Sequence, residues 1–210
     1  ATNASLYTTV VFSGTSWVAD SGYLKMTTAP VRGIWFGNHP TAGGDPGSFP
    51  VGSSLSGNKL TVTSLLTPDS QSWGYQLYDG SHAASFYFQA TDNGQTLPGV
   101  NISTAGGNLR VDDDGFNINV LHTYEIHLQG GIVSYTIDGE VVYEGAAGSG
   151  SGSAYYLLGD GSGSTPTGTG SMWIDSMSFD NAAGIVPEPQ HFAAVFGFGA
   201  CLFALLRRRA

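Results

Sequence analysis

The chain has few residues that could stabilise a fold through disulfides, structural metal sites or ion pairs. It has one cysteine in 210 residues, so an intramolecular disulfide and a structural zinc site built on cysteine are both excluded. Charged residues make up only 11% of the chain, under half the usual share. Aromatic residues reach 12%, which is unlike the composition of disordered chains. The sequence therefore indicates a folded protein that depends on its apolar core.

Positively charged residues are also few. Only Lys25, Arg32, Lys59 and Arg110 precede residue 185, against fifteen acidic residues, and the net charge of the chain is −9. A surface of this kind repels phosphate backbones. Nucleic acid is therefore excluded as a partner.

Several common catalytic patterns are also missing. No two histidines have the spacing of a catalytic zinc motif, and no G-x-S-x-G elbow occurs. A glycosidase needs two carboxyl groups that face each other across a cleft. Glutamate is found only four times, and Glu125 has His127 rather than an acid two residues further along its strand. We therefore expect a protein that is not an enzyme.

The patterns that are present indicate many short strands. Glycine occurs 31 times and, with Pro, Asn and Ser, separates segments rich in strand-forming residues. No helical periodicity precedes residue 190. The expected strands are 6–13, 23–28, 31–36, 59–66, 73–78, 84–90, 108–111, 116–120, 123–129, 133–138, 141–144, 154–158 and 171–179.

The clearest local pattern is HTYEIHLQGGIVSYTIDGEVVYEG, residues 122–145. Apolar and polar residues alternate on both sides of Gly130-Gly131, and Asp138-Gly139 is typical of a tight hairpin turn. These features predict a three-strand meander. The stretch 148–153, GSGSGS, is expected to be flexible filler.

This meander, followed by YYLLGDGSG and by SMWIDSMSFDN, resembles the C-terminal half of the concanavalin A-like (laminin G-like) jelly roll. The resemblance covers residues 120–181 and implies an all-β, two-sheet antiparallel jelly-roll sandwich over residues 1–184. It also implies frequent use as a carbohydrate-binding module or a glycosidase. The E-x-D-x-x-E strand of the laminarinase-like members does not occur.

The last 25 residues, VPEPQHFAAVFGFGACLFALLRRRA, have a different character. An uncharged run over about 190–206 predicts a single C-terminal hydrophobic helix of transmembrane type, and a cationic cluster after such a run marks the cytoplasmic side. The cluster is Arg207, Arg208 and Arg209. Small residues in the run would let another helix pack closely. The residues expected to make or pack this helix are Phe192, Phe196, Gly197, Gly199, Ala200 and Leu206.

Val186, Pro187, Glu188 and Pro189 stand directly before this helix, and the segment 185–210 resembles the PEP-CTERM sorting signal of Gram-negative bacteria. The resemblance implies export, transient anchoring in the inner membrane, and recognition by an exosortase. It also implies a final location at the cell surface or outside the cell, in an exopolysaccharide or biofilm context. The chain begins ATNASLYTTVVF, which is typical of an N-terminus left after leader removal.

Two sets of residues are candidates for ligand contacts. Asp112, Asp113, Asp114 and Asn117 place hard oxygens on one turn, which suits Ca²⁺, although a solvated acidic turn is the alternative. Exposed aromatic side chains could stack on sugar rings, although aromatic residues also fill cores. The aromatic candidates are Trp17, Trp35, Trp73, Tyr75, Tyr78, Tyr87 and Trp173, of which Trp73, Tyr75 and Tyr78 stand together.

These observations lead to a functional hypothesis with two alternatives. We expect an exported, non-catalytic cell-surface protein that is adhesive or binds carbohydrate, with exopolysaccharide or another glycan as partner. The first alternative is a structural subunit that self-associates into an oligomer, filament or sheath through the C-terminal helix or through strand pairing. The second alternative is a glycoside hydrolase.

Overall fold

The computed structural model describes fifteen β-strands within nine ranges of the chain. These ranges are residues 8–11, 16–27, 34–37, 57–67, 73–89, 99–112, 116–150, 154–160 and 171–181. The strands are β1 Thr8–Val11, β2 Ser16–Asp20, β3 Tyr23–Thr27, β4 Ile34–Gly37, β5 Asn58–Leu66, β6 Trp73–Tyr78, β7 His82–Gln89, β8 Gly99–Thr104, β9 Gly107–Arg110, β10 His122–Gln129, β11 Ile132–Ile137, β12 Glu140–Ala146, β13 Gly148–Ser149, β14 Tyr155–Asp160 and β15 Ser171–Asp180.

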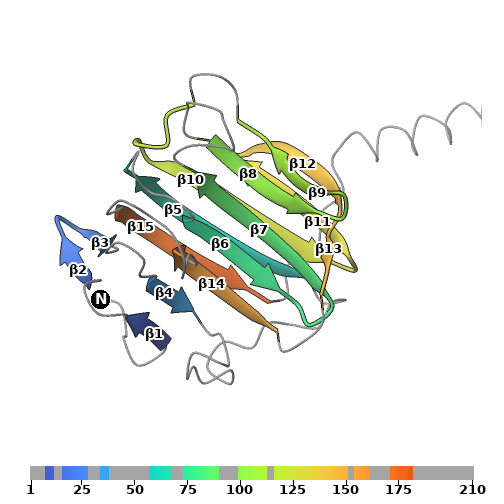
Figure 1. Ribbon diagram of the computed structural model, residues 1–210, viewed down its shortest axis with the longest axis horizontal. Coiled ribbons are helices and arrows are strands. Elements are labelled where there is room, and N and C mark those ends of the chain that lie inside the picture. Colours follow the sequence, from blue (N-terminus) through green and yellow to red (C-terminus); the bar gives the residue numbers. More distant parts are fainter. Residues whose placement is uncertain are drawn as a thin grey trace, which may run out of the picture.

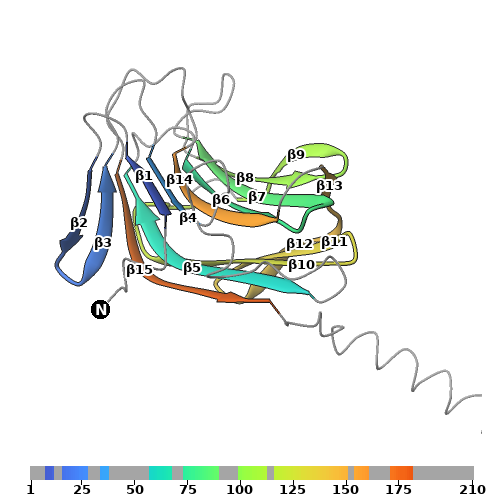
Figure 2. The ribbon, with the colours of Figure 1, turned by 90° about the horizontal axis from the view of Figure 1, so that it is seen from below.

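The strands form two antiparallel sheets that lie face to face (Figures 1 and 2). The first sheet has the order β1-β4-β14-β6-β7-β8-β9, and β13 pairs with β7 beside this path. The second sheet has the order β12-β11-β10-β5-β15-β3-β2. Strands adjacent in the chain are often in different sheets, so the chain passes repeatedly between the layers. The predicted all-β, two-sheet antiparallel architecture is confirmed.

Most of the expected strands occur within a few residues of their predicted bounds, and the meander of β10, β11 and β12 is confirmed. Residues 116–120 are a correction. They form a turn in which the Asn117 side-chain oxygen accepts a hydrogen bond from the Asn119 N–H, so the local side chain bends the chain away from a strand. The strands β2 and β8 were not predicted. Residues 148–149, expected to be filler, pair with Ala83 and His82 of β7.

Aromatic side chains from both sheets fill the space between them. Tyr124 of the second sheet lies 4.9 Å from Phe88 and 5.4 Å from Phe86 of the first, measured between ring centroids. Both phenylalanine side chains are fully buried. Edge-to-face contacts of this kind add to the area that the rings bury. The core therefore joins the sheets near the middle of β6, β7 and β10.

The C-terminal segment 182–210 lies outside the described residues, and with it the predicted helix, the Val186–Pro189 motif and the arginine cluster. Within the described ranges, the chain forms no helix that could span a bilayer.

Candidate functional site

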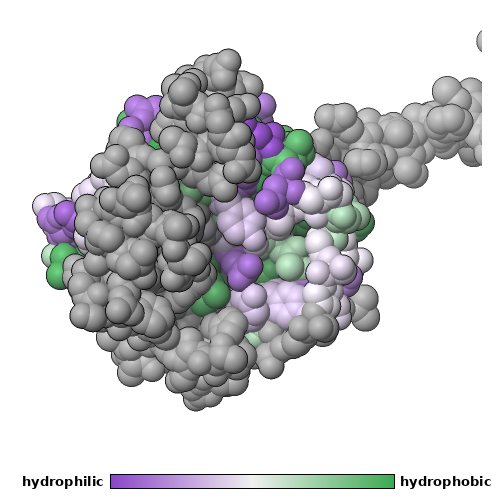
Figure 3. Space-filling view, viewed as in Figure 1, coloured by the Kyte–Doolittle hydropathy of each residue, from purple (hydrophilic) through white to green (hydrophobic). Residues whose placement is uncertain are grey.

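The outward side of the first sheet carries a group of polar and aromatic side chains, which we call the polar face. Alternation along each strand produces it: Tyr75 and Leu77 of β6 point into the core, so Gln76 points outward. In the same way Phe86 and Phe88 of β7 are buried and Tyr87 between them is partly exposed. Figure 3 looks onto this side of the molecule, where pale and purple residues gather over the middle of the sheet. The polar face consists of Gln76, Ser85, Tyr87, Asn101, Arg110 and Tyr155.

Three of these side chains form a hydrogen-bonded chain across β14, β6 and β7. The Tyr155 hydroxyl donates to Gln76 Oε1 at 2.9 Å, and Gln76 Nε2 donates to Ser85 Oγ at 3.4 Å. Burial raises the pKa of Tyr155 above its usual value, and the neighbouring Tyr87 and Tyr78 raise it further. Tyr155 is therefore a protonated phenol at neutral pH and can act as a proton donor.

A second row of residues crosses the sheet parallel to Gln76 and Ser85, two positions away along each strand. Strand register places Gly74 opposite Tyr87, Tyr87 opposite Asn101, and Asn101 opposite Arg110. A Cβ at Gly74 would lie 2.6 Å from the Phe86 carbonyl oxygen, so only glycine fits at this point of the row. Directly opposite residues on one face have neighbouring Cβ atoms. The row therefore brings Tyr87, Asn101 and Arg110 side by side at their Cβ atoms, and the Arg110 guanidinium extends over Gly99.

Two features of this row favour binding of an anion: a fixed arginine and an unsatisfied amide donor. The Arg110 guanidinium binds both carboxylate oxygens of Asp112, with Nε–Oδ1 at 3.0 Å and Nη2–Oδ2 at 3.1 Å. Asp112 Oδ1 also accepts a hydrogen bond from the Val100 N–H at 2.9 Å, so the arginine is held in place. Asn101 is only 8% exposed, and its Nδ2 has no hydrogen-bond acceptor in the described part of the chain. An amide donor left in this state is costly unless a ligand satisfies it.

The three residues predicted to contact sugar have different surroundings in the structure. Tyr75 is 1% exposed and its hydroxyl pairs with Ser64 Oγ inside the core, so the prediction of a sugar contact for Tyr75 is wrong. Tyr78 lies on the outward side, but Gly150 packs against its ring and leaves it 5% exposed. Trp73 belongs to β6, and its side chain is outside the described part. The contact between Gly150 and Tyr78 joins residues 72 positions apart in the chain, so no local sequence pattern predicts it.

The predicted calcium ligands are only partly described. Asp112 uses both oxygens on Arg110 and Val100, and the Asn117 side-chain oxygen is bonded to the Asn119 N–H. Asp113 and Asp114 lie outside the described residues, so the calcium prediction stays a prediction. Among the described residues, no three His, Cys, Asp or Glu side chains gather as a metal site.

Tyr87 was already among the aromatic candidates, whereas Asn101, Arg110, Gln76 and Tyr155 were not identified as site residues from the sequence. The sequence did predict the face of the strand on which Gln76 lies, because Gln76 alternates with the apolar residues Tyr75 and Leu77. The joining of β14 to β6, which brings Tyr155 to Gln76 across 79 residues of chain, left no local signal.

Comparisons of sequence identify no relative: no family model matches the chain, and no curated protein matches it. Comparisons of structure give many similar chains. Alginate lyase A1-II', a member of polysaccharide lyase family 7, has a TM-score of 0.55 at 11% identity, and the match covers 82% of this chain and 86% of the lyase. A polysaccharide lyase of family 18 has a TM-score of 0.53 at 11% identity, covering 85% of this chain and 96% of the other.

A sialidase gives a TM-score of 0.61 at 10% identity over 85% of this chain, which spans only 17% of the sialidase. The chain shares its fold with these two lyases and with part of the sialidase. At these identities the likeness concerns the fold. It nevertheless contradicts two expectations, that of a non-catalytic adhesive or filament-forming protein and that of no enzyme, because its structural neighbours are lyases and a sialidase.

Proposed function

We propose that the chain is a polysaccharide-processing enzyme, and specifically a lyase that cleaves a uronate-containing polysaccharide by β-elimination on the polar face. The observation that carries the proposal is the row of Tyr87, Asn101 and Arg110 beside the Tyr155–Gln76 pair, on a fold shared with alginate lyases. Phenol, amide and guanidinium groups are the set that this reaction needs.

In β-elimination a base removes the proton on the carbon next to the uronate carboxylate. The electron pair forms a carbon–carbon double bond, the bond to the glycosidic oxygen breaks, and that oxygen takes up a proton as the new chain end. The step needs donors that stabilise the charge developing on the carboxylate, and it needs a base and an acid within reach of the sugar.

The residues of the polar face can be assigned to these tasks. Arg110 and the Asn101 amide, which has no acceptor in the described residues, bind the uronate carboxylate. Tyr87, opposite Asn101, removes the proton as its phenolate and is left as a neutral phenol. Tyr155, which burial keeps protonated, donates to the departing oxygen, and Gln76 holds its hydroxyl in position. No cofactor is required by this assignment.

Hydrolysis suits the same face less well. Hydrolysis by the usual route needs two carboxyl groups across the scissile bond. Asp112 is the carboxylate that contacts Arg110 of the row in the described residues, and both of its oxygens are engaged by Arg110. The expectation of no enzyme rested on the absence of paired carboxylates, of a histidine zinc motif and of a serine elbow, and a tyrosine-based elimination needs none of these.

The test is incubation of the full chain with polyuronates, with detection of the conjugated double bond by ultraviolet absorbance and of unsaturated ends by mass spectrometry. We expect Tyr87→Phe and Tyr155→Phe each to lower kcat by at least about a hundredfold, since each removes a proton-transfer group. Arg110→Met is expected to weaken substrate binding and to lower kcat.

The matched control is Tyr23→Phe in β3 of the second sheet, which removes a phenol hydroxyl away from the polar face and is expected to leave turnover unchanged. Cleavage products without a double bond would indicate hydrolysis and refute the lyase assignment. Full activity in the Tyr87→Phe and Tyr155→Phe variants would refute the site.

We also propose that residues 185–210 act as a PEP-CTERM-type signal, with an exosortase and the inner membrane as partners and the cell surface as destination. The support is the sequence alone: Val186–Pro189, then an apolar run, then Arg207–Arg209. Intact masses of cell-associated and released protein test it. A released form that still carries Arg207–Arg209, or unchanged location after deletion of 186–210, would contradict the proposal.

A further inference from the structure

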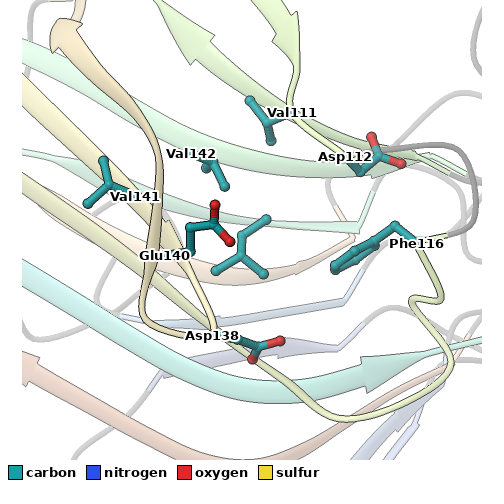
Figure 4. A pocket seen from close by; sticks show the side chains of 8 residues that line it. Val111, Asp112, Phe116, Asp138, Glu140, Val141 and Val142 are labelled. Carbon is teal, nitrogen blue, oxygen red and sulfur yellow. The ribbon is translucent and has the colours of Figure 1, made fainter.

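A pocket of about 500 Å³ opens at the side of the sandwich where the edge strands of the two sheets part. The end of β9 in the first sheet and the β11–β12 hairpin in the second sheet form its walls (Figure 4). This volume is in the range of small-molecule sites. The described residues that line the pocket are Val111, Asp112, Phe116, Ile137, Asp138, Glu140, Val141 and Val142.

The pocket combines an apolar wall with three carboxylates. Figure 4 shows the Phe116 ring extending into the space between Asp112 and Asp138, with Glu140 on the opposite side. Val141 in the pocket wall is itself 41% exposed. One face of the Phe116 ring is stacked on His122, with 4.3 Å between the ring centroids. The rest of the ring beside the carboxylates is a combination that favours organic cations.

Two of the three carboxylates already have cationic or donor partners. Asp112 is held by Arg110, and Asp138 Oδ2 lies 2.6 Å from His122 Nδ1. Glu140 is different, because no cation in the described part of the chain pairs with its carboxylate. The pocket therefore keeps one uncompensated negative charge next to apolar side chains.

A buried hydroxyl near the pocket also lacks a partner. Tyr124 is 1% exposed, stands opposite the pocket residue Ile137 in the strand register, and its hydroxyl has no hydrogen-bond partner in the described residues. Burial raises the pKa of Tyr124, and Tyr75, Asp138 and Asp112 raise it further. Tyr124 is not one of the described residues that line the pocket, so its hydroxyl lies behind the pocket wall and is not itself a ligand contact.

We propose that this pocket binds a small organic cation, a primary ammonium group carried on a short aliphatic chain. The ammonium group lies by Glu140 and the aliphatic part packs against Phe116, Val111 and Val142. The pocket shares Asp112 with the polar face, where Asp112 holds Arg110, but the proposed ammonium contact is Glu140 of β12, so binding does not require polysaccharide cleavage. Nothing in the proposal requires a metal ion, because Asp112 has no free oxygen to offer one.

The experiment compares hexylammonium with two probes of the same length, neutral 1-hexanol and anionic hexanoate, by amide chemical-shift titration of the isotopically labelled full chain. We expect hexylammonium to shift the amides of Phe116, Glu140 and Val142 with a dissociation constant at least about tenfold lower than that of 1-hexanol, and hexanoate to cause no saturable shift. Raising the salt concentration weakens hexylammonium binding because Glu140 and Asp138 are exposed.

Glu140→Gln is expected to weaken hexylammonium binding about fivefold, the loss of one partly exposed charge contact. Glu144→Gln, on the same strand but outside the pocket, is the matched control and is expected to bind as the parent does. Equal affinity for 1-hexanol and hexylammonium, or an equal effect of the two glutamate variants, would overturn the proposal. So would shifts at these amides caused by Ca²⁺ at lower concentration than by hexylammonium.

Discussion

The Tyr135 hydroxyl, carried by the second sheet, donates a 2.7 Å hydrogen bond to the Ser103 carbonyl oxygen of the first sheet. The same hydroxyl accepts a hydrogen bond from the Ser85 N–H at 2.8 Å. Regular pairing between β7 and β8 reaches Phe86 and Ile102, the residues next to these two serines. Tyr135 therefore satisfies the backbone groups where the β7–β8 ladder ends, and it ties the two layers together on the side behind the polar face.

Tyr135→Phe should destabilise the fold by about 2 kcal/mol, because the Ser85 N–H and the Ser103 carbonyl remain buried without their partner. Urea unfolding followed by tyrosine fluorescence measures the change. Tyr23→Phe in β3, far from this junction, should change the free energy of unfolding by less than about 0.5 kcal/mol. A loss equal in both variants would mean that the bridging hydroxyl adds nothing specific.

Gly74→Ala should cost about 2 kcal/mol, because its Cβ would lie 2.6 Å from the Phe86 carbonyl and would push β6 away from β7. The matched substitution is Gly106→Ala, where the nearest atom to a new Cβ is Thr104 Oγ1 at 3.7 Å. Gly106→Ala should be neutral or slightly stabilising. Thermal unfolding of the two variants tests this, and we expect the lower melting temperature for Gly74→Ala. Equal melting temperatures would show that β6 can shift without a loss of stability.

Asp138 links the hairpin turn to His122 and should make stability depend on acid pH. Burial alone would raise its pKa, but hydrogen bonds from His122 and from the Thr123 N–H outweigh it, so the pKa lies below the usual 3.8. The folded state then binds fewer protons than the unfolded state below about pH 4, and the contribution of Asp138, present above that pH, is lost as the pH falls through the folded-state pKa.

Asp138→Asn tests this link, since asparagine also tolerates the positive φ of 51° at this turn position and keeps an acceptor for Thr123. Its unfolding free energy should fall less steeply than that of the parent between about pH 5 and pH 2. Urea midpoints at several pH values give the two profiles. If the unfolding free energies of parent and variant fell in parallel with pH, protonation of Asp138 would not contribute to the pH dependence of stability.

Buried tyrosines should set the alkaline limit of stability. Burial raises the pKa of Tyr135 to about 12 and raises the pKa values of Tyr75 and Tyr124 as well. Above pH 10 the unfolded chain loses phenolic protons that the folded chain keeps, so stability is complete below pH 10 and declines as the pH rises toward 12. Spectrophotometric titration should show a late, cooperative ionisation that coincides with unfolding. Independent ionisation near pH 10 of every tyrosine would contradict this.

Local patterns predicted much of the second sheet. In residues 122–145 the alternation of apolar and polar residues and the turns at Gly130-Gly131 and Asp138-Gly139 determine strands, turns and the buried face together, and β10, β11 and β12 follow them. The same local reasoning failed for Phe116–Val120, because strand propensity there competes with the Asn117 side chain, which turns the chain.

The sequence by itself determined the all-β architecture and the acidity of the chain. It also determined that Tyr124, Ile126 and Leu128 lie on the buried face of their strand. These properties depend on composition or on residues close together in the chain. Only the tertiary structure decided that Tyr75 is core, that Gly150 covers Tyr78, and that Tyr155 meets Gln76 while Arg110 stands beside Asn101. Those relationships depend on which strands become neighbours in the first sheet. Strand order is chosen by the packing of the whole core, which no local stretch of sequence contains.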